Sequence, residues 1–593
     1  MVMKASFKVL VRLFKKHISR FFTIIAIALV SVGFMSGVME IENKVDSAMD
    51  QFYESQNLSD LLIKSKKATG FSEEELDFIS FHFSEEQQMK SFSYDCYMEE
   101  EIVRIYYFDQ YPNSINQLEL QEGSWPKNMQ EIVVERKTNT IKSYDIGDIV
   151  SYQNQDYRIS GIVLNPLIIH QDKEISYLGA EQSLDAVWYF YTPHLPIVND
   201  LYLTFSNRTI FHAFSKEYKI EIQENQEWMK HSLGEENIEV LSLYENFGFY
   251  SLSLYANKVS IIGSIAVVFF SLITLLVVYS TMTRLLDEER AQIACIKTLG
   301  FGRLKMIRPY LWFVGLAVGI GGLIAFGVGI GFTSIIYHAF NIQYVMPPMP
   351  IHIRPFSYIL LFLLVFISTF VLTWISSFKI ANQKPATLLT PKAPKKGKKV
   401  ILERIPFVWN RFSFKYKSTI RNVLLFKSRF FMTVLSIIGS TVLVLSGFGI
   451  LDCSLAKDSG ASSLEVIAVA LILFSAVLCA LVIYNLTNIN VSERTREIAT
   501  LMVLGYKDNE VTGYIFREIY IMSFIGAILG VPAGYGFLHF LFYLIEFGSI
   551  AEIKWYTWLI APALTMLFSL LSTALLYKKI VTTDMNGSLK MLE

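Results

Sequence analysis

DEERAQIACIKTLGF at residues 287–301 and SERTREIATLMVLGY at residues 492–506 are two versions of one charged motif. We call these segments elbow 1 and elbow 2. Each follows a long apolar run and precedes two more, so the same element recurs at the same place in two similar blocks. The chain is therefore expected to contain a duplicated membrane unit.

The composition is that of a membrane protein, since 52% of the residues are hydrophobic. A helix needs roughly 20 apolar residues to cross the bilayer core. Runs of this kind predict eight spans, which lie near Phe21–Met39, Val259–Thr281, Tyr310–Tyr337, Phe356–Ser377, Phe430–Leu451, Leu464–Tyr484, Tyr514–Leu544 and Trp555–Tyr577. The first span has a long basic lead and full spanning length, so we expect a retained anchor and not a cleaved signal peptide.

The distribution of Lys and Arg predicts the orientation, because short basic loops resist translocation. Basic residues concentrate in the N-terminal lead, both elbows, the linker 379–429 and the tail Lys578-Lys579, which are expected in the cytoplasm. The loops 339–355 and 452–463 carry one base each and are expected outside. Both termini are then cytoplasmic, and residues 41–256 are extracellular.

The net charge of zero conceals a division along the chain. Residues 41–256 contain 36 Asp and Glu against 16 Lys and Arg, so the rest of the chain is correspondingly basic. Such an acidic surface disfavours nucleic acid. It could attract a cationic peptide, but a solvated, soluble surface is the simpler interpretation. No ligand is assigned from charge alone.

The two halves differ by one insert. SRFF at residues 19–22, before the first span, recurs at residues 428–431, before the fifth, at an offset of about 410, whereas the elbows are offset by only 205. The first half therefore contains about 205 residues that the second lacks, between its first and second spans. Close helix packing is expected at the glycines of the third and seventh spans, which are Gly315, Gly319, Gly322 and Gly526, Gly530, Gly534.

The insert reads as an α+β domain on two stalks. Residues 46–56 and 241–258 are expected to be helical stalks, and residues 73–83 and 215–230 are expected to be helices. Short alternating runs at 131–135, 148–152 and 157–163 predict a small strand-rich module between residues 119 and 166. Cys96 and Cys453 face outward, and we expect two free thiols in preference to a disulfide.

The predicted fold is an α-helical polytopic membrane protein with eight transmembrane helices in two four-helix repeats and one α+β extracytoplasmic domain. The expected segments are an interfacial helix with the first span (1–40), the outer domain with its stalks (41–256), spans two to four (257–380), a basic linker (381–427) and spans five to eight (428–593).

The sequence contains no recognisable catalytic motif. It has no phosphate-binding GxxxxGK[ST], no HExxH and no Cys pair at zinc spacing, so no enzyme, cofactor or metal site is predicted. The middles of the spans also lack Asp, Glu, Lys and Arg, which argues against a gradient-driven carrier; transport in liposomes without an ATPase would revive that hypothesis. Energy for any work is expected to come from a soluble partner.

Such a partner could act on the chain at the two elbows. Apolar residues recur in both at helical spacing and a Gly ends each helix, so two short amphipathic helices are expected under the membrane. A mere interfacial anchor would not need the same polar pattern twice, which favours a docking surface.

The chain resembles the FtsX-like (MacB-type, type VII ABC) permease family. The resemblance rests on ERTREIATL…LGY at 493–506, on EGSWP at 122–126, and on the strands that follow it, EIVV at 131–134, IGD at 146–148 and SGIV at 160–163. The linker, with PKAPK at 391–395 and ERIP at 403–406, is similar to that of two-repeat permeases of Gram-positive bacteria.

The resemblance implies a permease that binds two copies of a separate ABC ATPase, which would hold ATP and Mg, and that transmits ATP-driven motion to the outer domain in the cell membrane. The residues that it implies for ATPase coupling are Glu288, Glu289, Arg290, Gln292 and Gly300 in elbow 1, and Glu493, Arg494, Arg496, Glu497 and Gly505 in elbow 2. Elbow 1 has Gln292 where elbow 2 has Glu497, so docking at the two sites is expected to be unequal.

Two functions remain open. The permease could export or extract a lipid, peptide or antimicrobial at the outer leaflet. Alternatively, it could serve a regulatory complex that senses antimicrobial peptides or controls an extracellular partner such as a cell-wall hydrolase. The second half has only a short outer loop, so either function would depend on the single outer domain.

Overall fold

The computed structural model describes residues 2–109, 111, 114–171, 174–178, 182–195, 197–205, 215–350, 355–390, 411, 413–425, 427–456 and 462–582. Within these residues, eight helices are long and apolar enough to cross a membrane, and a separate sheet-rich domain is inserted after the first. The predicted fold class is confirmed. The motifs at 391–395 and 403–406 lie outside the described residues.

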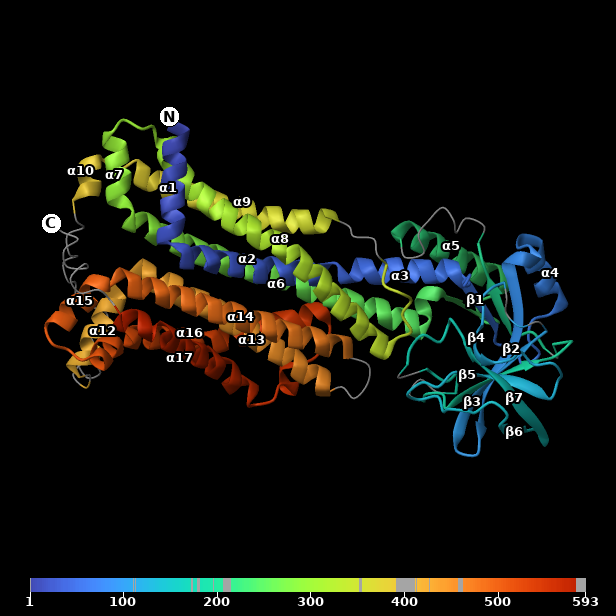
Figure 1. The fold of residues 1–593 in the computed structure, drawn as a ribbon. Helices are drawn as coiled ribbons and strands as arrows, with labels where there is room; N and C mark the ends of the chain where they lie inside the picture. The colour runs from blue at the N-terminus through green and yellow to red at the C-terminus, as the bar shows by residue number, and fades with distance from the viewer. Residues whose placement is uncertain are drawn as a thin grey trace.

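The membrane helices form two blocks that lie side by side along one axis (Figure 1). The first block contains α2 (Ile18–Met39), α6 (Phe247–Glu288), α8 (Arg303–Gln343) and α9 (Pro355–Ala381). The second contains α13 (Lys427–Ala456), α14 (Ser462–Glu493), α16 (Asp508–Ile545) and α17 (Thr557–Val581). Five shorter described helices lie at one end, namely α1 (Val2–Lys16), α10 (Pro385–Leu389), α12 (Phe414–Leu425) and the elbow helix of each block.

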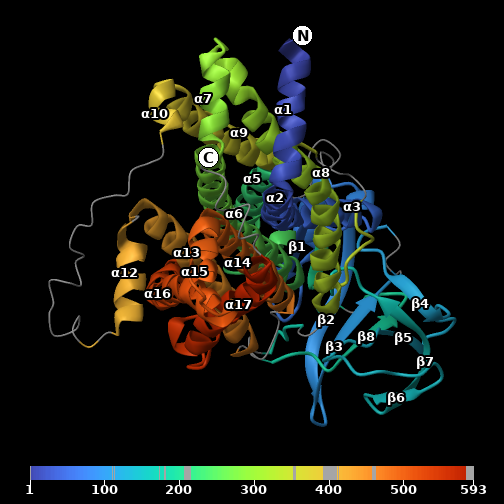
Figure 2. The same cartoon turned by 60° about the vertical axis from the view of Figure 1, so that its left-hand side comes forward.

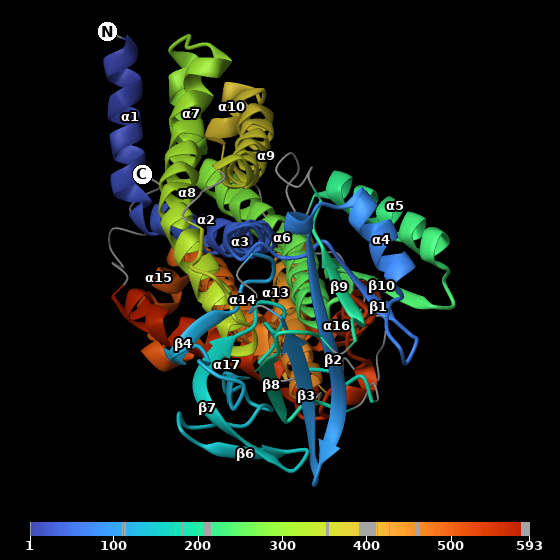
Figure 3. The ribbon, with the colours of Figure 1, turned by 90° about the vertical axis from the view of Figure 1, so that its right-hand side faces the viewer.

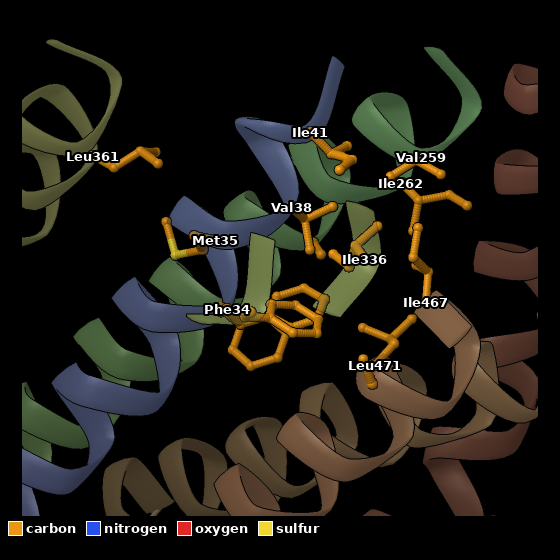
Figure 4. Close-up of a cluster of buried hydrophobic side chains, with 14 of the residues drawn as sticks. Phe34, Met35, Val38, Ile41, Val259, Ile262, Ile336, Leu361, Ile467 and Leu471 are labelled. Atoms are coloured by element: carbon orange, nitrogen blue, oxygen red, sulfur yellow. The ribbon is translucent and has the colours of Figure 1, made fainter. Parts of the chain in front are cut away.

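A buried apolar cluster joins the two blocks. The ring of Phe34 in α2 stacks on Phe270 in α6, with centroids 4.9 Å apart, and lies 5.2 Å from Phe474 in α14. Figure 4 shows Phe34 near the centre of this cluster, with Ile336 and Leu471 both to its right in this view. Because such aromatic and aliphatic contacts exclude lipid, the blocks form one continuous core.

The duplication extends to the closest helix contacts. Gly526 packs against Ile437 of α13, where a Cβ atom would come within 2.7 Å of that side chain. Gly321, which is 205 residues earlier, packs in the same way against Ala28 and the backbone of Ile25 in α2. Of the glycines predicted to pack in the first block, Gly322 lies against the ring of Phe362, whereas a Cβ atom at Gly319 would meet nothing within 4 Å, so the prediction holds at Gly322 and is wrong at Gly319.

The inserted domain, called the head, contains a ten-stranded sheet in the order β10-β1-β9-β2-β3-β8-β5-β7-β4, with β6 paired to β7. The pairs β3·β8 and β5·β7 are parallel and the others antiparallel. Helices α4 (Glu73–His82) and α5 (Lys216–Leu233) lie next to each other beside the sheet (Figure 3). The strands are β1 (Leu61–Ser65), β2 (Gln88–Met98), β3 (Glu101–Phe108), β4 (Glu119–Gly123), β5 (Glu131–Glu135), β6 (Ile149–Tyr152), β7 (Gln155–Leu164), β8 (Ala186–Tyr191), β9 (Asp200–Leu203) and β10 (Ile238–Ser242).

The sheet is larger than the predicted module at 119–166. It gains β1, β2, β3, β8, β9 and β10. Of these, β3, β8 and β9 are buried almost throughout, so they lack a clean alternation of buried and exposed residues. The first residues of the expected return stalk are also not helical. Residues 238–242 form β10, and α6 begins only at Phe247, where Asn246 caps it.

Three membrane helices reach the head. α3 (Ile41–Ser55) continues α2 outward, and α6 returns as an unbroken helix of 42 residues. The end of α8 also pairs with the head, since Gln171 N–H donates to the carbonyl of Gln343 and Val345 N–H donates to that of Ile169, both at 2.7 Å. The head therefore has a third support in addition to the two predicted stalks.

Candidate functional site

The two elbow helices lie at the end of the bundle opposite the head. They are α7 (Arg290–Thr298) and α15 (Thr495–Val503), each between the second and third long helix of its block (Figures 1 and 2). α7 runs across the axis of the bundle in both views. The predicted amphipathic helices are therefore present, and each buries its Ile-Ala pair, Ile293-Ala294 and Ile498-Ala499.

Both elbow helices end in the same hydrogen-bonded motif. In elbow 1, Gly300 N–H donates to the carbonyl of Lys297 (3.1 Å) and Phe301 N–H donates to that of Ile296 (3.4 Å). In elbow 2, the N–H groups of Gly505 and Tyr506 make the equivalent bonds at 3.0 and 3.2 Å. These are Schellman caps, and the φ angles of Gly300 (81°) and Gly505 (86°) explain why each motif contains glycine.

The acidic pair at the start of elbow 1 is bound by the N-terminal segment. Arg20 donates to both carboxylate oxygens of Glu288, at 2.5 and 3.0 Å. Glu289 accepts a hydrogen bond from Lys16 at 2.7 Å and pairs with His17 at 2.9 Å. Burial by itself would raise the pKa of Glu289, but these two partners outweigh it and lower the pKa to about 2. The carboxylate is therefore held ionised at the junction of α6 and α7.

Elbow 2 uses the opposite charge at the equivalent position. Arg494 stands 205 residues after Glu289, and its guanidinium contacts the carboxylate of Glu518 in α16 at 2.7 Å. Both side chains are buried, with 8% of each exposed. Glu493 lies 3.7 Å from Arg284 of α6, so this junction is also tied to the first block.

Elbow 1 is further attached to the segment after α9. Arg290 donates to the carbonyl of Thr387 at 3.0 Å, and Lys297 donates to the carbonyls of Ala381 and Gln383, both at 2.6 Å. α7 is therefore tied to the end of α9 and to α10.

The structure divides the ten residues predicted for coupling into two groups. Glu288, Glu289, Arg290, Glu493 and Arg494 make the internal contacts described above. Gly300, Gly505 and Glu497 are exposed, Gln292 is half-buried, and Arg496 lies in α15 with its side chain outside the described part.

Exposed apolar side chains surround the two caps, and sequence reasoning missed them as surface residues. Leu299 in elbow 1 is 75% exposed, and Leu504 and Tyr506 in elbow 2 are 69% and 51% exposed. Large apolar side chains concentrated at such tips are typical of protein contacts. The Leu-Gly-aromatic ending that the two elbows share contained this signal.

Among the described residues, no group of three or more His, Cys, Asp or Glu could hold a metal ion, and the four cysteines are free thiols. Fold and elbows together define a polytopic membrane protein of the transporter-permease class, built from two repeats with one inserted head.

The family model of the FtsX-like permease C-terminal domain matches the chain twice, over residues 264–385 and 469–585. The chain thus contains two copies of the FtsX-like permease C-terminal domain, which matches the two-repeat architecture of FtsX/MacB-type permeases, as the elbows predicted. Each matched region contains one elbow with the helices on either side. No curated protein matches the sequence.

This family assignment gives the protein a permease-type role in an ABC transporter. Family members are typically membrane subunits without enzymatic activity that associate with an ABC ATPase.

Proposed function

We propose that the protein couples ATP hydrolysis by a separate ABC ATPase to movement of the head. Two ATPase copies would bind at elbow 1 and elbow 2 on the cytoplasmic side of the cell membrane, and the head would lie outside. The basic elbow end and the acidic head support this orientation. ATP and Mg would be held by the partner.

The observation that carries the proposal is the double connection between elbow 1 and the head. α6 ends at Glu288, where elbow 1 begins, and α8 starts at Arg303, just after elbow 1. At 1.5 Å per residue, the 42 residues of α6 span about 63 Å. The far ends of both helices reach the head, so a tilt of α7 would be passed to the head through α6 and α8.

Elbow 2 acts on the head indirectly in this proposal. α16 ends at Ile545, and the next carbonyl, that of Glu546, accepts a hydrogen bond from Lys258 in α6 at 3.4 Å. Motion of the second block would then be passed to the stalk of the first. The two elbows would then differ in their effect on the head.

Export or extraction of a lipid, peptide or antimicrobial at the outer leaflet is the function we favour. The membrane helices contain no charged side chain at mid-span, and the moving part would be the head, so a mechanical action on an amphiphile fits better than passage through a polar pore.

Copurification tests the partner. We expect the full-length chain to copurify with an ABC ATPase, and the elbow-2 variant Glu497→Lys with Leu504→Asp to lose the copy bound at elbow 2. The first substitution reverses a charge at that contact, and the second places a carboxylate where an apolar side chain would be covered by the partner. The matched control is Ile149→Asp, an equally exposed apolar residue in the head. Equal ATPase recovery with the elbow variant would count against the proposal.

A second candidate function, the regulatory complex, is favoured by an aromatic surface on the head. Phe81 in α4 is 87% exposed and Trp228 in α5 is 40% exposed. The ring of His82 lies between them, with its centroid 5.2 Å from Phe81 and 5.1 Å from Trp228. Exposed aromatic clusters favour a protein or peptide partner.

Crosslinking on intact cells tests this alternative. An extracellular protein that crosslinks to the head, and is lost in the variant Phe81→Ala with Trp228→Ala, would favour regulation. The control variant Tyr97→Ala with Met129→Ala removes exposed side chains of the head outside α4 and α5. A crosslinked partner that survives both variants would remove the support that this surface gives.

A further inference from the structure

The N-terminal helix α1 is strongly basic. The first 39 residues contain six Lys and Arg and no Asp or Glu, and the first acid is Glu40. On α1, Lys8, Arg12 and Lys15 are exposed and recur at helical spacing, so they form one charged stripe.

The other side of α1 is apolar and packed on the bundle. Leu13 is 4% exposed. The ring of Phe14 lies 4.7 Å from Phe21 in α2 and 5.3 Å from Phe313 in α8, measured between centroids. Figures 1 and 3 show α1 running across the axis of the bundle at the elbow end. A basic amphipathic helix in this position lies along the surface of the membrane.

The helices next to α1 present the side chains expected at a lipid headgroup boundary. Ile18 and Phe22, at the start of α2, are exposed and apolar. In α8, Arg308 is exposed one turn before Trp312, which is 49% exposed. Trp near the end of a membrane helix is typical of the interface, and Arg there suits a phosphate oxygen.

α1 is also joined to elbow 1. Lys16, its last residue, and His17, where the chain turns into α2, both contact the buried carboxylate of Glu289. Arg20, one turn further on, holds Glu288. Any force that fixes α1 on the membrane therefore reaches the junction of α6 and α7 through these contacts.

We propose that α1 is a binding site for anionic phospholipid headgroups, and that its occupancy steadies elbow 1 through Lys16, His17 and Arg20. The occupant is an anionic lipid because the exposed stripe is uniformly positive and lies where the headgroups are. The steadying of elbow 1 deepens the proposed function and rests on it, whereas the lipid site itself does not require an ATPase.

Native mass spectrometry of the detergent-purified full chain tests the site with two probes, phosphatidylglycerol and phosphatidylcholine. We expect the wild type to retain phosphatidylglycerol preferentially. The variant Lys8→Gln, Arg12→Gln, Lys15→Gln should lose about 5-fold in that preference for each charge, so on the order of 100-fold in total. Equal retention of the two lipids by the wild type, or unchanged preference in the variant, would overturn the proposal.

Two control variants separate location from net charge. Lys8→Arg, Arg12→Lys, Lys15→Arg keeps the charges and should keep the preference. Lys127→Gln, Lys216→Gln, Lys219→Gln removes three exposed charges from the head and should also keep it. A loss equal to that of the α1 variant in the head control would mean that net charge decides, and would overturn a site on α1.

Hydrogen exchange of the full chain in nanodiscs tests the link to elbow 1. Exchange across residues 285–299 should be slower with phosphatidylglycerol than with phosphatidylcholine in the wild type, and equal in the two lipids in the α1 variant. Equal exchange in the wild type would overturn the link. The measurement includes no ATPase, so its failure would leave the copurification test standing, and failure of copurification would leave the lipid site standing.

Discussion

Gly300 and Gly505 occupy the same backbone position in the two elbows. Each has a positive φ angle, and a Cβ atom added to either would meet no neighbouring atom within 4 Å. The requirement for glycine is therefore conformational and not a matter of space. Sequence alone could predict these caps, because an apolar periodicity that ends in glycine is a local pattern.

Replacing these glycines should loosen the ends of the elbow helices. Gly300→Ala or Gly505→Ala forces an L-residue into the left-handed region at a cost of about 1–2 kcal/mol. We expect faster hydrogen exchange at the cap amides, residues 300–301 or 505–506, without loss of the fold. Gly→Asn at the same positions should have a smaller effect, because Asn tolerates this region. Unchanged exchange in the Ala variants would contradict the Schellman assignment.

The contacts that hold the elbows could not be predicted at the residue scale. Glu288 and Glu289 looked like surface charges in an amphipathic helix, but they contact residues about 270 positions earlier in the chain. A long-range pairing of this kind leaves no periodic signal. Likewise, no pattern in the sequence pairs Arg494 of elbow 2 with Glu518 of α16, which the fold brings to 2.7 Å.

Two buried carboxyl groups make the stability of the head depend on pH. Burial raises the pKa of Glu135 to about 8, against the opposing hydrogen bond from Tyr189, and burial raises that of Glu174 to about 7. The folded state therefore retains protons that the unfolded state has lost above about pH 4.5. Stability contributed by these groups is complete below that pH and falls as pH rises through 7 and 8, by at most about 1.4 kcal/mol per unit for each group.

Thermal unfolding of the full chain, followed by tryptophan fluorescence, checks this prediction. The melting temperature of the head transition should fall between pH 5.5 and 8.5, and Glu135→Gln should flatten that fall. Glu119→Gln, at an exposed position in β4, serves as the control and should leave it unchanged. An identical pH profile in the wild type and in Glu135→Gln would contradict the raised pKa.

At the scale of elements, hydropathy is sufficient to predict the membrane helices but not the strands of the head. A helix surrounded by lipid must be apolar over its full length, which makes it visible in sequence. Strands such as β8 and β9 are buried almost throughout, so they read as short apolar runs without alternation. The third support of the head, at the end of α8, depends on backbone hydrogen bonds that carry no side-chain signature.

The proposed transmission of motion to the head depends on the unbroken length of α6. Tyr255→Pro, placed two turns into this helix, removes a backbone hydrogen bond and should cost about 3 kcal/mol or more locally. We expect the variant to bind its ATPase normally but to lose the ATP-dependent response of the head. Tyr255→Ala keeps the helix and should keep the response. Full response in the Pro variant would show that α6 does not carry the motion.

At the scale of the whole molecule, the duplication explains the bundle and the insertion explains its asymmetry. Gly321 against Ala28 and Gly526 against Ile437 show that both repeats pack by one plan. Among the described residues, the first repeat has its long helices continued into a head, and its elbow is bound to the N-terminal segment. In the proposed function, inputs at two elbows would therefore be converted into movement of one head.

Distance measurement between spin labels tests the central claim most directly. One label replaces exposed Lys216 on the head and the other replaces exposed Thr298 at the end of α7, in the full chain with Cys295 changed to Ser and with its copurified ATPase. The account predicts that the distance distribution shifts on addition of ATP and vanadate, and that the shift disappears in Tyr255→Pro. If the labelled protein with Tyr255 unchanged gives the same distance distribution with and without nucleotide, the result would contradict the account.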